Sequence, residues 1–291
     1  MIYTNKTGLP KQLVKALQSS DYEKKSDYSV TQILKEVRPV ILAQRHNKDI
    51  EKDVTEMLWS FLGSAVHTFL EKGETSGDIT EERLYYRATE GKTVSGKFDL
   101  YDSETKTLYD FKITSKWSYV YIADKKDFQK QLSIYAWLLE KEGFKVEHIA
   151  NILFFRDWGK YDVDKVPSSM VVVEHPILPK IDGLPIQEWL NERISDFEAC
   201  KDVADDDLPF CTPEYRWAKY TAKVIPEGNK RSVKNFDSSE EGWKEKAEAL
   251  ADQLTKEKDR KHNVEIYGEE WKRCEYCDAR DFCNQYQEGN K

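Results

Sequence analysis

The sequence contains no apolar run of about 18 residues or more, the length that a membrane-spanning helix needs. Its N-terminus also lacks a basic segment followed by an apolar one, so no secretory signal is visible. Internal repeats and low-complexity tracts are absent as well. We therefore expect an intracellular, cytoplasmic protein with no membrane partner, and 291 residues allow one large domain or a core with an appendage.

Cysteine is scarce, and none precedes Cys200. An odd total of five in a chain of this length favours metal ligation or free thiols over a disulfide framework, and it fits a reducing compartment. A positive net charge is also lacking. The formal charge of −8 argues against indiscriminate binding of the whole surface to nucleic acid, because phosphates would be repelled on average.

The hydrophobic pattern predicts an α/β chain. The helix expected over 54–71 has apolar residues at three- and four-residue steps, which predicts packing against a core, and its Gly63 would allow close approach to another backbone. We expect further helices over 124–142, 186–200 and up to about 258, and strands over 83–89, 93–101, 107–114, 149–155 and 170–174. The acidic run 205–207 marks a junction, giving a helical N-terminal region (1–55), a core (56–200) and a C-terminal segment (201–291).

A pair of carboxylates and a lysine lies on two neighbouring predicted strands. Asp110 and Lys112 share one strand face, and Asp99 on the adjacent strand brings a second carboxylate beside the first. Two hard oxygen ligands suit Mg²⁺ or Mn²⁺, and an ammonium beside a metal-bound water favours its deprotonation. The alternative is a solvated hairpin with ordinary exposed charges.

Three further residues extend this constellation. His67 lies on the helix that precedes the strands, although a lone histidine there is more often packed and hydrogen-bonded than a ligand. Gln131 and Tyr135, four residues apart, project from one helical face toward the sheet, or form a polar residue beside a core tyrosine. Glu82, at the start of the strand before Asp99, is a possible extra carboxylate.

The order and spacing of these motifs resemble the RecB-like branch of the PD-(D/E)xK nuclease superfamily, whose pattern is a histidine on a helix, G-x-x-D, D/E-x-K and Q-x-x-x-Y. The matching segments are Gly-Ser-Ala-Val-His at 63–67, Gly-Lys-Phe-Asp at 96–99, Asp-Phe-Lys at 110–112 and Gln-Leu-Ser-Ile-Tyr at 131–135. The resemblance implies a restriction-endonuclease-like core, with a central mixed β-sheet flanked by helices, a helical N-terminal region and a cysteine-clamped C-terminal segment.

The same resemblance implies roles for the motif residues. His67, Asp99 and Asp110 would bind the catalytic Mg²⁺ or Mn²⁺, with the Phe111 carbonyl as an additional ligand. Lys112 would activate or orient the attacking water. Gln131 and Tyr135 would support the site and the substrate.

Three cysteines, Cys274, Cys277 and Cys283, lie within ten residues, and thiolates are preferred ligands of zinc and of iron–sulfur clusters. Cys211 is the better placed fourth ligand. The arrangement resembles the [4Fe–4S] staple of AddB-type and CRISPR-associated RecB-like nucleases, although in those proteins the distant cysteine generally precedes the catalytic motifs. A phage-type subgroup carries Pro-x-Cys-x-Pro-Glu-x-x-Trp after the core, as at 209–217. Structural Zn²⁺ remains the alternative.

A basic and aromatic stretch lies between Cys211 and Cys274. It is expected to track a phosphate backbone and stack on bases, through Arg216, Trp217, Lys219, Lys230, Arg231 and Lys234. A solvated loop with some aromatic packing is the alternative. We hypothesise that the cysteine staple fixes this stretch over the active site.

The expected function is a Mg²⁺- or Mn²⁺-dependent deoxyribonuclease, an exonuclease on single-stranded DNA or DNA ends. Its setting would be phage DNA replication, recombination or repair, which would place a phage-encoded protein in the host cytoplasm. The alternatives are DNA-end trimming of the CRISPR-adaptation type and a non-cleaving DNA-binding module. Homo-oligomers and replication or recombination proteins are the expected partners besides DNA.

Overall fold

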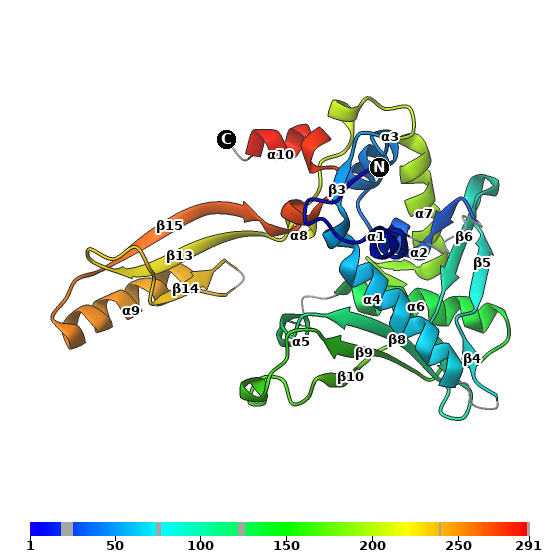
Figure 1. Ribbon diagram of the computed structural model, residues 1–291, viewed down its shortest axis with the longest axis horizontal. Coiled ribbons are helices and arrows are strands. Elements are labelled where there is room, and N and C mark those ends of the chain that lie inside the picture. Colours follow the sequence, from blue (N-terminus) through cyan, green and yellow to red (C-terminus); the bar gives the residue numbers. More distant parts are fainter. Residues whose placement is uncertain (19–25, 74–76, 122–125, 239, 290–291) are drawn as a thin grey trace. The chain divides into compact units, whose positions relative to one another are not determined.

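The computed structural model (Figure 1) describes residues 1–18, 26–73, 77–121, 126–238 and 240–289. These residues form two compact units, Met1–Ala204 (unit 1) and Asp205–Lys291 (unit 2). Among the described residues, no helix combines the length and apolar composition that crossing a membrane requires.

Unit 1 contains the predicted α/β pattern. Its helices are α1 (Lys11–Gln18), α2 (Val30–Ile33), α3 (Val37–Arg45), α4 (Leu58–Leu70), α5 (Trp117–Val120), α6 (Lys126–Lys141) and α7 (Ile186–Ala199). Its strands are β1 (Ile2–Thr4), β2 (Tyr28–Ser29), β3 (Glu51–Asp53), β4 (Ile79–Thr80), β5 (Arg83–Arg87), β6 (Thr93–Lys97), β7 (Leu100–Asp102), β8 (Thr107–Thr114), β9 (His148–Phe155), β10 (Met170–His175), β11 (Lys180–Ile181) and β12 (Leu184–Pro185).

The main sheet of unit 1 has five strands in the order β10-β9-β8-β7-β4. β8 and β9 are parallel, with Asp110 paired to Asn151, whereas the other neighbours are antiparallel, so the sheet is mixed. A parallel pair needs a long crossover, and α6 supplies it. Leu132 and Ile134 of α6 are fully buried, as are Leu108 and Leu153 of the strands it covers. This burial fixes α6 on one face of β8.

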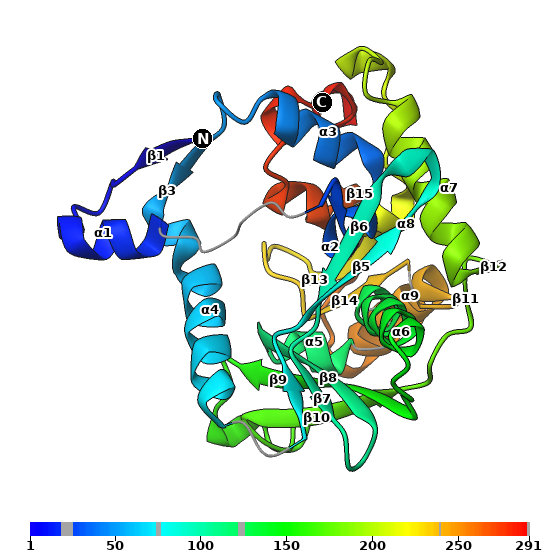
Figure 2. The same cartoon turned by 90° about the vertical axis from the view of Figure 1, so that its right-hand side faces the viewer.

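Helix α4 lies on the other side of β8, away from α6 (Figure 2). The helix predicted over 54–71 forms and packs against β8 as predicted, but only partly, because none of its residues is fully buried. Leu58, Trp59 and Phe69 are 41%, 43% and 71% exposed. The expected close backbone approach at Gly63 is also absent, since a Cβ built there meets nothing within 4 Å.

Unit 2 is a three-stranded antiparallel sheet in the order β14-β13-β15, with one helix packed on it. Its elements are α8 (Pro213–Arg216), β13 (Ala218–Pro226), β14 (Lys234–Asp237), α9 (Trp243–Lys258), β15 (His262–Trp271) and α10 (Asn284–Gly289). The core cluster between α9 and the sheet has five buried residues, Ala222, Val224, Phe236, Ala247 and Ala251. It is a small core, and the cysteine-rich segment follows β15 outside it.

Candidate active site

In unit 1, two neighbouring segments are each interrupted between one strand and the next, and the two interruptions lie opposite each other. The chain passes from β4 to β5 at Glu81 and Glu82, and from β6 to β7 at Phe98 and Asp99. The strand expected over 93–101 is therefore two strands, each in a different sheet. Across the break, the Glu81 N–H donates to the Asp99 carbonyl at 3.0 Å, and Phe98 is fully buried beneath it. The interruption brings the side chains of Glu81 and Asp99 to the same place.

Glu81 has a left-handed backbone conformation with φ of 51°. This region is unfavourable for residues with a Cβ, at a cost of about 1–2 kcal/mol, and such residues concentrate at functional sites. The conformation lets Glu81 join the break, and the next residue, Glu82, is exposed. The extra carboxylate that the sequence placed at Glu82 is thus supplied by its neighbour.

His67, in the last turn of α4, faces these carboxylates. Its Nδ1 lies 2.7 Å from Glu81 Oε1 and 3.5 Å from Asp99 Oδ1. The donor atoms of His67, Glu81 and Asp99 all lie within 4.8 Å of one another, a spacing at which three side chains can hold one cation. The ammonium of Lys97 also pairs with Glu81.

Asp110 is 3% exposed and is held by three side chains. Lys112 Nζ lies 2.9 Å from its Oδ1 and 2.8 Å from its Oδ2. Gln131 Nε2 donates to Oδ1 at 3.3 Å, while its Oε1 accepts from Lys112 at 3.2 Å. Asn151 Nδ2 donates to Oδ2 at 2.7 Å. The carboxylate is therefore fixed in position by contacts from β8, β9 and α6.

A hydrogen-bonded chain continues from Asp110 across two more strands. A carboxylate only accepts, so the Asn151 amide nitrogen must face Asp110 and its oxygen must face His175, 2.9 Å away. The oxygen in turn requires His175 to donate from Nε2, which fixes the tautomer. Burial lowers the pKa of His175, which favours this neutral form.

Tyr135 closes the site on the α6 side. It is 3% exposed, and its hydroxyl accepts from Gln131 Nε2 at 3.0 Å. A Cβ built on Gly96 would lie 2.6 Å from Tyr135 Cε1, so only glycine lets the ring lie against β6. This contact explains why the G-x-x-D segment begins with glycine.

The electrostatics follow from carboxylates crowded away from water. Burial, and next the charge of Asp110, raise the pKa of Asp99 to about 7. The hydrogen bond to Glu81, joined by the charge of Asp99, raises the pKa of His67 against the effect of burial. Burial opposes ionisation of Glu81, but hydrogen bonds from His67 and Lys97 lower its pKa. Excess negative charge at Asp99 is the condition that a bound cation relieves.

The structure brings the sequence-predicted residues of unit 1 into one chain of contacts. His67 meets Asp99, whose Oδ2 accepts from the Phe111 N–H at 2.6 Å, and the residue before Phe111 on β8 is Asp110. Lys112, Gln131 and Tyr135 continue from Asp110. Sequence reasoning missed Glu81, Asn151 and His175. Two adjacent glutamates before the strand were a signal for Glu81, but no spacing pointed to the other two.

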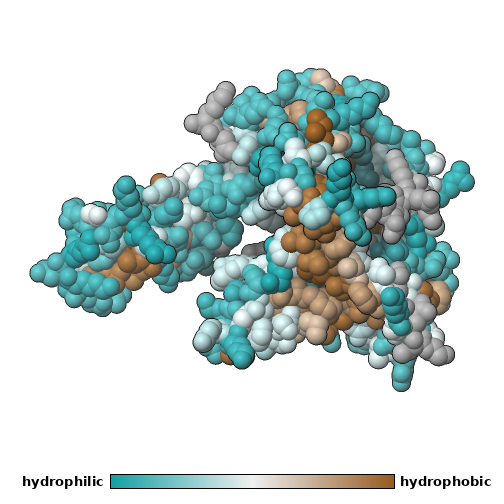
Figure 3. All heavy atoms as spheres, viewed as in Figure 1, coloured by the Kyte–Doolittle hydropathy of each residue, from teal (hydrophilic) through white to brown (hydrophobic). Residues whose placement is uncertain are grey.

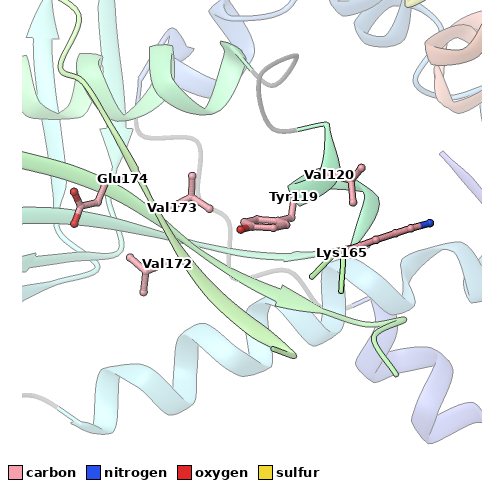
Figure 4. Close-up of a pocket in the computed structure, with 6 residues that line it drawn as sticks. All are labelled: Tyr119, Val120, Lys165, Val172, Val173 and Glu174. Atoms are coloured by element: carbon pink, nitrogen blue, oxygen red, sulfur yellow. The ribbon is translucent and has the colours of Figure 1, made fainter. Parts of the chain in front are cut away.

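An open pocket of about 610 Å³ lies elsewhere in unit 1, beside β10 and α5 (Figure 4). Tyr119 and Val173 point toward each other across it, and Lys165 extends away. None of the metal-facing residues lines it. The candidate site is therefore the carboxylate cluster and not this pocket.

The comparisons with known proteins agree with this geometry. A family model described as the PD-(D/E)XK nuclease superfamily matches residues 11–284, nearly the whole chain. The chain belongs to the PD-(D/E)XK nuclease superfamily. Its mixed sheet and flanking helices fit the restriction-endonuclease-like fold of that superfamily. Membership implies a nuclease that uses divalent metal ions.

Other comparisons add little to the superfamily assignment. The solved structure titled "Crystal structure of SSO0001" is similar over 67% of this chain and 87% of its own, with 16% identity and a TM-score of 0.43. A likeness at this level supports no conclusion about fold or function. No curated protein matches the chain.

The cysteines of this superfamily member lie in unit 2, apart from Cys200, and none of the five described cysteines forms a disulfide. Burial, and next the neighbouring Cys277 and Cys283, raise the pKa of Cys274 to about 11. Gln285 ties Cys211 to the C-terminal segment: it accepts from the Cys211 N–H at 2.8 Å and donates to the Cys211 carbonyl at 2.9 Å.

The predicted DNA-binding stretch is divided in the structure. Arg216 is 8% exposed, donates to the Cys211 carbonyl at 3.1 Å and lies 4.0 Å over the Trp271 ring. Its side chain is thus engaged within unit 2. Lys219 Nζ lies 3.5 Å from Asp237 Oδ2, and Lys234 lies over Phe236. Trp217 is 40% exposed, and Lys230 and Arg231 are exposed on the turn between β13 and β14.

Proposed function

We propose that the protein is a Mg²⁺- or Mn²⁺-dependent deoxyribonuclease, acting as an exonuclease on single-stranded DNA or DNA ends. The observation that carries the proposal is the set of donor atoms from His67, Glu81 and Asp99 within 4.8 Å of one another. Asp110 and Lys112 stand on the strand beside it. Oxygen-rich donors with one imidazole fit Mg²⁺ or Mn²⁺.

The donor atoms of His67, Glu81 and Asp99 would hold the cation, with Asp110 and the Phe111 carbonyl as further ligands. Bound there, it supplies Lewis acidity that offsets charge on a phosphodiester and acidifies water. The side chain of Lys112 holds its ammonium beside Asp110, where it orients the attacking water and stabilises negative charge. Gln131 holds the side chains of Lys112 and Asp110 beside each other, because it hydrogen-bonds to both.

We also propose that Cys211, Cys274, Cys277 and Cys283 hold a [4Fe–4S] cluster, with structural Zn²⁺ as the alternative. A buried polar atom supports a negatively charged occupant. Arg216 Nη1 has no hydrogen-bond partner among the described residues, although it lies 3.7 Å from Glu269 Oε2. Burial raises the pKa of the nearby Cys274, and the charge of Arg216 opposes that rise. A thiolate-ligated centre would add negative charge beside this guanidinium, next to that of Glu269, and it fits a reducing, intracellular setting.

The exposed Trp217, Lys230 and Arg231 support DNA binding by unit 2, which is the remaining part of the predicted basic stretch. Phage DNA replication, recombination or repair is the proposed setting. DNA-end trimming of the CRISPR-adaptation type and non-cleaving DNA binding are the competing functions. The ammonium of Lys112 lies beside both Asp110 oxygens, the position that the proposed hydrolysis requires. This favours cleavage over binding alone.

Linear and circular single-stranded DNA of equal sequence separate these possibilities. An exonuclease degrades the labelled linear strand with Mg²⁺ or Mn²⁺ and leaves the circle intact, whereas an endonuclease nicks both. Labels at the 5′ or 3′ end report polarity. Asp164→Asn is the matched control for Asp110→Asn, because Asp164 is an exposed carboxylate of the same unit. Binding without cleavage of either substrate, for every variant, would overturn the enzyme proposal.

A further inference from the structure

A row of three residues runs along one face of α4 toward the candidate metal site. Trp59, Gly63 and His67 are four residues apart, so they follow one another on the same side of the helix. At ~1.5 Å per residue, Trp59 lies about 12 Å along the axis from His67. His67 in turn lies against Glu81 and Asp99. The row therefore leads from an indole to the metal-facing donors.

The far end of the row combines an exposed ring with a cation. Trp59 is 43% exposed, and the Arg156 guanidinium lies 4.5 Å from the centre of its ring. Arg156 is itself exposed at the end of β9, where its N–H donates to the Thr114 carbonyl at 3.0 Å. It makes no ion pair with any residue that the structure describes. An exposed indole beside an uncompensated guanidinium is a combination that unpaired nucleic acid recognises.

The middle of the row is open. A Cβ built on Gly63 meets nothing within 4 Å, and α4 has no buried residue. Figure 3 shows an apolar surface over α4 in the centre of the view. If α4 were a core helix, its apolar residues would be covered. The surface between Trp59 and His67 is thus free to receive a ligand that lies along the helix.

We propose that the row Trp59–Gly63–His67, with Arg156, is the track that seats an unpaired nucleic-acid strand. A base stacks on Trp59, the adjoining phosphate contacts Arg156, and the strand passes over Gly63 to place a phosphodiester at the donors beside His67. The distance of about 12 Å corresponds to roughly three stacked nucleotides. The inference rests on the proposed nuclease function and deepens it by choosing unpaired strands among the proposed substrates and naming the residues that would seat them. A duplex base is already stacked on both sides and cannot use the indole.

Gly63→Gln gives the sharpest test. Glutamine favours helix over glycine, so the variant keeps or raises the melting temperature while its side chain covers the track. Trp59→Ala and Arg156→Gln remove the two ends of the contact. Ser64→Gln, on the exposed side of α4, is the control for added bulk. Phe69→Ala is the control for a lost ring, since Phe69 is 71% exposed and also lies near a cation, Lys72.

The measurement is fluorescence anisotropy of labelled oligothymidylate and of a matched duplex, with Ca²⁺ in place of the reactive cation. Stacking of one base on an aromatic ring changes affinity by about five- to a hundred-fold. We expect Trp59→Ala and Gly63→Gln to weaken single-strand binding about ten-fold, and duplex binding less than two-fold. Both controls should bind as the wild type does. Mn²⁺ affinity, measured by calorimetry, should stay unchanged in all five variants.

The outcomes separate this inference from the proposed function. If the wild type cleaves DNA but Trp59→Ala and Gly63→Gln bind and cleave like the controls, the track is wrong and the nuclease stands. Equal losses on single-stranded and duplex DNA would also overturn it, because stacking would not be the cause. If the wild type neither binds nor cleaves any DNA, both the track and the proposed nuclease function are overturned.

Discussion

The carboxylates of unit 1 and the cysteines of unit 2 are both candidate metal ligands, yet they are positioned in different ways. Asp110 is held by hydrogen bonds from Lys112, Gln131 and Asn151, which reach it from as far as 41 residues away in the sequence. Cys274, Cys277 and Cys283 are neighbours in sequence, and their segment is shaped by short backbone turns.

The difference shows which interactions position the candidate ligands of each site. The donors of unit 1 are arranged by packing and by protein hydrogen bonds, so the site is formed before a cation binds. Unit 2 has a core cluster of five buried residues, and its cysteine segment lies beyond it. When a small unit cannot bury enough surface, metal binding becomes part of its folding energy. We therefore expect metal removal to unfold part of unit 2 and to leave the fold of unit 1 intact.

The largest effect is expected at the cysteines. Cys274→Ser should abolish stoichiometric iron and the broad visible absorption of a cluster, because a [4Fe–4S] centre needs four thiolates. Metal analysis and absorption of protein purified without oxygen check this. Cys200→Ser is the control, since Cys200 belongs to unit 1. Zinc without iron in the wild type would replace the cluster by the Zn²⁺ alternative, and no metal at all would remove the site.

The next effect concerns the lysine beside Asp110. Lys112→Met should lower the cleavage rate by about 100- to 10,000-fold, the usual contribution of a positioned acid or base, and leave Mn²⁺ affinity nearly unchanged. Lys116→Met is the matched control: Lys116 also pairs with an aspartate, at 2.7 Å from Asp162, with a similar exposure. Single-turnover rates measure the difference. Equal rates in the two variants would show that Lys112 takes no part in the chemistry.

A smaller effect is expected from the hydrogen bonds that run from Asp110 through Asn151 to His175. Asn151→Ala removes the 2.7 Å hydrogen bond to Oδ2, and loss of such an outer partner reduces metal affinity about 10- to 100-fold. His175→Leu should act in the same direction but more weakly, and His175→Gln, which can still donate to Asn151, should recover part of the affinity. Calorimetric Mn²⁺ titrations decide. Wild-type affinity in Asn151→Ala would contradict the positioning role.

The smallest effect is a pH dependence. The pKa of Asp99 is raised from 3.8 to about 7, so without metal the folded state keeps a proton that the unfolded chain releases at lower pH. Stability of the metal-free protein thus falls as pH rises between these two values, and Mn²⁺ recovers it by taking the proton's place. The rise in melting temperature on adding Mn²⁺ should grow with pH and level off above about 7. Asp99→Asn should remove this trend; an equal Mn²⁺ effect at every pH would refute it.

Several of these residues could be predicted from the sequence and several could not. Alternation along one strand placed Asp110 and Lys112 on a common face, and an i, i+4 spacing placed Gln131 beside Tyr135, because these relations are local. Glu81 was missed because the break between β6 and β7 interrupts the alternation that favoured Glu82. Asn151 and His175 join the site through strand order, which no spacing encodes.

The helix α4 and Arg216 show the other limit. Apolar periodicity predicted the helix correctly but could not tell a core-facing stripe from an exposed one, and α4 has no buried residue. Arg216 lies in a basic stretch that resembles a DNA-binding surface, yet it is buried against Trp271 and Cys211. Charge patterns describe composition along the chain, whereas burial depends on which distant residues cover the side chain.

Restoring metal to stripped protein tests the central claim most directly. Protein of the wild type, Asp99→Asn and Asp110→Asn would be treated with EDTA, dialysed, and supplied with Mg²⁺ or Mn²⁺ and end-labelled DNA. We predict no cleavage by the stripped wild type, recovery on adding either cation, and no recovery in the two variants, which remain folded. Cleavage that survives EDTA, or that Asp110→Asn retains at the wild-type rate, would contradict the assignment of the nuclease centre to these carboxylates.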